Sequence, residues 1–166
     1  MPPYVAEMPL AGLKTAELLL LTTLRLWLAA RRRADVPDWR QGFAAAGLIE
    51  DGAADFDMTL RILVAGVRRL DGRPAGHPRL STDEARLLCL FGALQRGETG
   101  AAVGILQAWL PSKPLRWLLR YARSFVGVMA ARRLILPDRT AEEGPHIALR
   151  TSLGAFLDRG FFGLRR

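Results

Sequence analysis

The sequence predicts an all-α protein, a single-domain bundle or array of about six to seven helices. Apolar residues recur at three- and four-residue spacing in several segments, the pattern of helices that bury one face. No stretch alternates apolar and polar residues as a half-buried strand does, so we expect no sheet. The 166 residues suit one domain. We predict that this domain spans residues 1–158 and that a short aromatic and basic tail, residues 159–166, follows it.

The first predicted helix runs from Leu13 to Arg33 and is apolar on nearly every side, as in the centre of a bundle. Its apolar run from Ala16 to Ala30 is shorter than the roughly 20 residues that span a bilayer. Arg25 interrupts this run and shares one narrow line of the helical wheel with Lys14 and Arg32. We therefore expect a buried helix and no transmembrane segment.

Two further helices and a linker are predicted next. A short helix extends from Asp38 or Trp39 to Ala46, and Gly47 is a natural stop. A longer one covers 53–70, with a buried face made of Phe56, Leu60, Leu63, Val67 and Leu70. Residues 71–79 contain two glycines and two prolines, the composition of a linker.

A helical hairpin is predicted after this linker. Ser81 and Glu84 have the spacing of a capping box, the clearest helix start in the chain. This helix runs to about Arg96 and stops at Gly97. A shorter helix, 98–110, ends at Pro111 and completes an antiparallel pair.

The last part of the chain is predicted to hold two helices and the tail. Ser112 is a suitable cap for a helix that runs to about Leu134. A polar loop, 137–145, and a final helix, roughly Ile147 to Asp158, complete the domain.

No set of residues has the spacing of a catalytic or metal centre. His77 and His146 flank prolines in loops, with no second ligand at helical spacing. Cys89, the only cysteine, is best interpreted as a small apolar residue. Helix-start charge accounts for the acidic cluster, namely Glu50, Asp51, Asp55 and Asp57. We expect no enzyme activity, no cofactor, no metal and a cytoplasmic location.

The net charge of +8 is concentrated in residues 112–137, which carry six basic residues and no acidic one. The basic residues of the chain are almost all arginines, which we attribute to the composition of a GC-rich, bacterial-like coding sequence. On a helical wheel Trp117 lies beside several cations and opposite the apolar stripe. This face gives the predicted partner-binding residues: Lys113, Arg116, Trp117, Arg120 and Arg123. The competing interpretation is that Trp117 packs against a neighbouring element and the arginines form a solvated face.

These observations favour a non-enzymatic α-helical protein-interaction module: an adaptor, a regulator or a complex subunit, with another protein or a second copy as partner. The alternative is a nucleic-acid-binding protein that uses the basic face of the helix 113–134. A secondary candidate site is the tail, which could contact an anionic membrane surface, fold back or dock on a partner. Its residues are Phe161, Phe162, Leu164, Arg165 and Arg166.

Overall fold

The computed structural model describes residues 3–32, 37–48, 51–66 and 70–139. In these ranges the chain forms six α-helices and no β-strand, which confirms the predicted all-α class. The helices are α1 (Thr15–Ala30), α2 (Arg40–Ala45), α3 (Ala53–Gly66), α4 (Thr82–Gln95), α5 (Thr99–Gln107) and α6 (Ser112–Ala131). The predicted helix 147–158 and the tail 159–166 lie outside the described residues.

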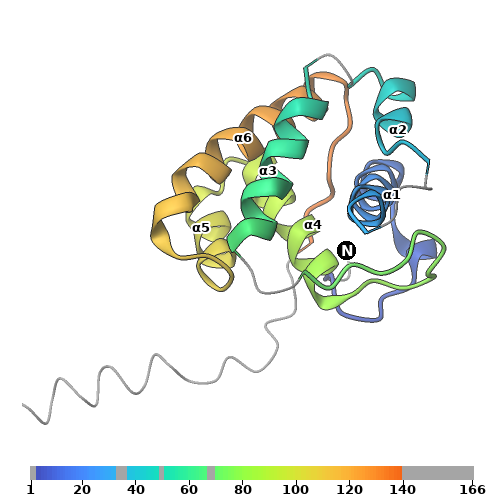
Figure 1. Cartoon of the computed structure of the whole chain (residues 1–166), viewed down its shortest axis with the longest axis horizontal. Coiled ribbons are helices and arrows are strands. Elements are labelled where there is room, and N and C mark those ends of the chain that lie inside the picture. The colour runs from blue at the N-terminus through green and yellow to red at the C-terminus, as the bar shows by residue number, and fades with distance from the viewer. Residues whose placement is uncertain (1–2, 33–36, 49–50, 67–69, 140–166) are drawn as a thin grey trace, which may run out of the picture.

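Helices α3 and α6 lie side by side as the most extensive helix pair of the fold (Figure 1). They run antiparallel, because Gly52, just before α3, lies against Phe125 and Val128 near the end of α6. At the other end a side chain at Gly66 would overlap Leu110, just before α6. Helix α4 packs on α1, α5 and α6, and α1 is viewed almost end-on in Figure 1.

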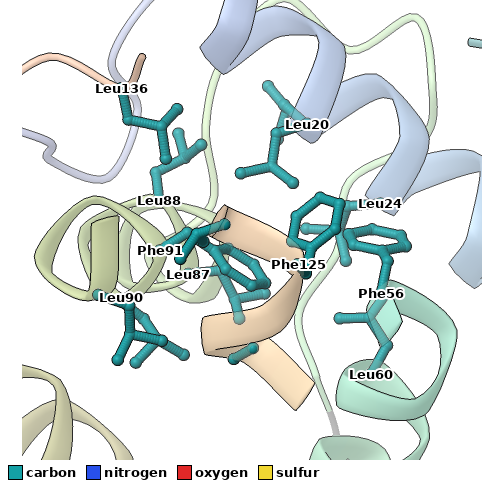
Figure 2. Close-up of a cluster of buried hydrophobic side chains, with 14 of the residues drawn as sticks. Leu20, Leu24, Phe56, Leu60, Leu87, Leu88, Leu90, Phe91, Phe125 and Leu136 are labelled. Carbon is teal, nitrogen blue, oxygen red and sulfur yellow. The ribbon is translucent and has the colours of Figure 1, made fainter. Parts of the chain in front are cut away.

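The core is built around one aromatic cluster. Phe43 of α2, Phe56 of α3 and Phe125 of α6 pack against one another with ring centroids 4.9–5.5 Å apart. Phe91 of α4 and Trp39 extend the cluster. Figure 2 shows Phe56, Phe91 and Phe125 among leucines from α1, α3 and α4. The sequence predicted the first helix to be the central one. Helix α4 is more completely enclosed, because every residue from Leu87 to Leu94 is buried.

The helix ends follow the predicted capping signals in part. The capping box at Ser81 is present: Glu84 N donates to Ser81 Oγ at 3.1 Å, and Ser81 N donates to Glu84 Oε2 at 2.9 Å. Gly47 and Gly97 have φ of +68° and +78°, the left-handed conformation that ends a helix. The predicted cap at Ser112 is wrong by one position, because Pro111 is the N-cap and α6 begins at Ser112.

Helix α6 ends before Leu134, where the prediction put its end. Arg133 has φ of +58°, and Leu134 N donates to Met129 O at 2.9 Å, which closes the last turn. The chain then returns along α4, where the Gln95 amide donates to Leu134 O at 2.9 Å and accepts from Leu136 N at 2.7 Å. Helix α1 also ends earlier than predicted, at Ala30, and Leu70, the predicted last residue of the helix 53–70, is not helical.

Two buried ion pairs connect α1 to distant parts of the chain. Arg25 pairs with Glu84 of α4, and its guanidinium donates to the carbonyls of His77 and Arg79 at 2.6 and 2.7 Å. Its side chain is 1% exposed, whereas Lys14 and Arg32, which share its line on the helical wheel, are exposed. The linker 71–79 therefore has fixed polar contacts to α1.

The second pair joins Arg139 to Glu17, Nε to Oε1 at 3.0 Å, with both side chains almost fully buried. Arg139 Nη2 also donates to Gly12 O at 2.7 Å, and its guanidinium lies 5.4 Å from the Tyr4 ring centroid. Burial raises the pKa of the Tyr4 phenol, and the adjacent Glu17 carboxylate raises it further, so this hydroxyl stays protonated. This cluster fixes the end of the described chain against α1.

Candidate functional site

The predicted cationic face lies on the outer side of α6. The inner side is a buried stripe that holds α6 against α3 and α4: Leu118, Leu119, Ala122, Phe125, Val126 and Met129. Trp117 lies on the outer side and is 45% exposed, so it is not buried against a neighbouring element. The four predicted cations are also exposed. Together with Trp117 they form what we name the Trp117 surface: Lys113, Arg116, Trp117, Arg120 and Arg123.

Two arginines of this surface lie against aromatic rings. The Arg116 guanidinium is 5.1 Å from the centroid of the Trp117 ring. The Arg120 guanidinium is 6.0 Å from the ring centroids of both Trp117 and Tyr121. Cation–π contacts at exposed sites contribute about 0.5–1 kcal/mol each, enough to favour one arrangement of these side chains. The Trp117 indole is therefore in contact with the guanidinium groups of Arg116 and Arg120.

Arg123 differs from the other cations because it is engaged within the fold. Its Nη2 donates to Thr99 Oγ1 at 2.7 Å and so connects α6 to the first residue of α5. Within residues 3–32, 37–48, 51–66 and 70–139, no carboxylate forms an ion pair with any of the four cations. The charge of this surface is thus left uncompensated by the described part of the chain.

A groove of about 380 Å³ lies beside Trp117, between α3 and α6. We name it the α3/α6 groove, and its lining residues are Met58 and Ile62 of α3 with Pro114, Trp117 and Tyr121 of α6. Sequence reasoning missed the contribution of α3. The sequence holds a pattern that could have indicated it, because Met58 and Ile62 are four residues apart on a face of α3 distinct from its buried one.

On α3, next to the groove-lining helix face, the charges of Asp57 and Arg61 are paired with each other. Arg61 Nε donates to Asp57 Oδ2 at 2.7 Å, and Trp27 Nε1 donates to Asp57 Oδ1 at 2.7 Å. Partial burial would raise the pKa of Asp57, but these two hydrogen bonds outweigh it and hold the pKa below its usual range. Asp57 is therefore a specific partner of Trp27 and Arg61, beyond the helix-start charge that the sequence predicted.

The other candidate residues do not form a site in the described ranges. The backbone carbonyl of His77 accepts a hydrogen bond from Arg25 of α1, and the Sγ of buried Cys89 lies 3.8 Å from Arg139 O. Among the described residues no three His, Cys, Asp or Glu side chains are grouped so that they could hold a metal ion. None of the described helices combines the length and apolarity needed to cross a membrane. Glu50, His146 and the tail residues lie outside the described part: Phe161, Phe162, Leu164, Arg165 and Arg166.

Comparison of the chain with known protein families, with curated proteins and with solved structures found no match. Function is therefore inferred from the Trp117 surface and the groove beside it.

Proposed function

We propose that the protein is a non-enzymatic protein-interaction module, an adaptor, regulator or complex subunit, that binds its partner through the Trp117 surface. The observation that carries this proposal is the 45% exposure of Trp117 beside an apolar groove and against Arg116. Trp and Arg are the residues most enriched among those that dominate binding energy in protein interfaces. An indole that is large, exposed and bordered by arginines suits such a role.

The way α6 is held in the fold supports this proposal. Its inner stripe is buried against α3 and α4, and Arg123 ties it to Thr99 of α5. A surface on a rigid helix loses little conformational entropy when it binds, so more of the contact energy appears as affinity.

The proposal is tested by isolating partners from the native lysate and measuring the mass of the protein in solution. Trp117→Ala and Arg120→Glu should each abolish a partner or self-association that the wild type shows. Arg32→Glu is the matched control, because Arg32 is also exposed and this variant makes the same charge change at the end of α1. A strictly monomeric wild type without a recoverable partner would contradict the proposal.

A second candidate function is nucleic-acid binding by the same helix, favoured by four cations without carboxylate partners around an exposed indole. In that case affinity should fall steeply with salt, with a log–log slope of roughly 0.7–0.9 per phosphate contact. Arg120→Glu should reduce both affinity and slope. Equal retention of wild type and Arg120→Glu on DNA and RNA columns would eliminate this candidate.

A further inference from the structure

The apolar residues of the α3/α6 groove follow helical register on both of its sides. Pro114, Trp117 and Tyr121 stand at i, i+3 and i+7 of α6, and Met58 and Ile62 stand at i and i+4 of α3. From Pro114 to Tyr121 the lining extends about 10 Å, or about two helical turns. A furrow between two antiparallel helices, lined in this way, matches a third helix that inserts side chains at three- and four-residue spacing.

The groove collects most of the large apolar surface that the described chain leaves exposed. Among the described residues the exposed large hydrophobic side chains are Met58, Trp117 and Ile135, and the first two line the groove. Contiguous exposed apolar surface bordered by polar residues is typical of an interaction site. Met58, whose unbranched thioether adapts to different shapes, gives the lining some tolerance for its occupant.

The charge beside the groove differs between its two sides. On α6 the groove adjoins Lys113, Arg116 and Arg120, and none of them pairs with a carboxylate of the described residues. On α3 Arg61 is paired with Asp57, and Asp55, one turn before Met58, has no cation partner among the described residues. A helix in the groove would therefore meet surplus positive charge along its α6 side alone.

From these three observations we propose that the α3/α6 groove binds an acidic amphipathic helix of a partner protein. Its apolar side chains pack on Met58, Ile62 and Trp117, and its Asp or Glu side chains lie along the α6 side against Arg116 and Arg120. This proposal rests on the proposed function and adds the chemistry of the partner. Pairing of carboxylates with arginine supplies orientation, and the apolar lining supplies most of the affinity.

Charge complementarity favours this occupant over two others. The tail of this chain ends in Arg165 and Arg166 and would add positive charge to a positive surface. A second copy docked symmetrically would place the cations of one α6 against those of the other, because a twofold interface brings the same patch together. Like charges placed opposite each other oppose both arrangements.

The experiment is a selection from a random peptide library displayed on phage, with the full-length protein as bait. The selected sequences should carry apolar residues at three- and four-residue spacing and Asp or Glu along one flank. Affinity of a synthetic selected peptide is then measured by fluorescence anisotropy. Replacing its Glu residues by Gln should weaken binding at least about tenfold, as should Arg120→Glu in the protein.

The variant Met58→Glu distinguishes peptide binding in the groove from peptide binding by the cations alone. It places a carboxylate in the lining without touching α6, and we expect it also to weaken peptide binding at least about tenfold, whereas Arg32→Glu should leave affinity unchanged. For each variant the unfolding curve is measured and must match that of the wild-type protein. A peptide whose binding responds to Arg120→Glu and not to Met58→Glu overturns the groove proposal and leaves the proposed function intact. Selected sequences without acidic residues overturn it as well.

Two further measurements, peptide affinity and mass in solution, identify the two disfavoured occupants. Phe161→Ser with Phe162→Ser in the full-length chain should not change peptide affinity, and tighter binding would show that the tail occupies the groove. A wild-type dimer that Trp117→Ala converts to a monomer would show that a second copy occupies it. Either result overturns the proposal of an acidic partner helix.

Discussion

Arg25 of α1 and Glu84 of α4 form a buried ion pair, with Nη2 and Oε2 2.8 Å apart and each side chain 1% exposed. Glu84 is also the capping-box residue that accepts from Ser81 N, and it accepts from Arg73 N at 2.9 Å. The Glu84 carboxylate thus connects α1, the start of α4 and the linker between α3 and α4.

Removal of Arg25 should therefore destabilise the protein strongly. Arg25→Ala leaves the Glu84 charge buried without its partner and frees the carbonyls of His77 and Arg79, so we expect a loss of about 3–5 kcal/mol in the free energy of unfolding. Arg61→Ala, which breaks a more exposed pair with Asp57, should cost about 1 kcal/mol or less. Urea unfolding of both variants checks the difference, and equal losses would contradict it.

The cap at Ser81 should contribute a smaller, separable amount. Ser81→Ala removes the acceptor of Glu84 N and the donor to Asp71 O, and we expect a loss of about 1–2 kcal/mol. Thr82→Ala, one position later at an exposed side chain, should change stability by less than about 0.5 kcal/mol. Thermal unfolding of the pair measures the cap, and a Thr82→Ala loss as large as that of Ser81→Ala would contradict it.

Quenching of tryptophan fluorescence should isolate Trp117. The indoles of Trp27 and Trp39 are buried and Trp109 is half-buried, so acrylamide should reach Trp117 most readily. In Trp117→Phe the strongly quenched component of the emission should disappear, while the unfolding curve moves little because the side chain is exposed. An unchanged quenching curve would show that Trp117 is covered in solution.

Acid should weaken the fold partly through Asp57. Its pKa is lowered in the folded state, so its contribution to stability is present above the ordinary Asp pKa of about 4 and is lost as the pH falls through the lower folded value. Asp57→Asn should therefore flatten the acid side of the plot of unfolding free energy against pH. Arg61→Gln should flatten it only in part, because Trp27 still donates to Asp57. If the acid side of this plot is unchanged in Asp57→Asn, Asp57 does not contribute to the loss of stability in acid.

The sequence predicted the features that depend on neighbouring residues. The stops at Gly47 and Gly97 and the box at Ser81 are local backbone chemistry. The helical repeat places Trp117 opposite the apolar stripe, but it left open whether the indole packs against a neighbouring element. Contacts between distant segments were not predictable in this way. Arg25 and Glu84 are 59 residues apart, and nothing near Arg25 indicates which residue pairs with it.

The groove illustrates the same limit. Of its α6 lining the sequence analysis named Trp117 but not Pro114 or Tyr121, and the α3 half needs the antiparallel packing of α3 on α6, which no local pattern reports. Met58 and Ile62 were visible as an apolar pair outside the buried stripe of their helix. Only the packing shows that this pair meets Trp117.

The contacts of Arg139 determine when the fold can be completed during synthesis. Arg139 is held by Glu17 and Gly12, more than a hundred residues earlier in the chain, and Gln95 holds the segment just before it. A chain made from its N-terminus gains these contacts only after residue 139 has been synthesised. The Glu17 carboxylate of α1 therefore has no Arg139 partner until nearly all of the described residues are present.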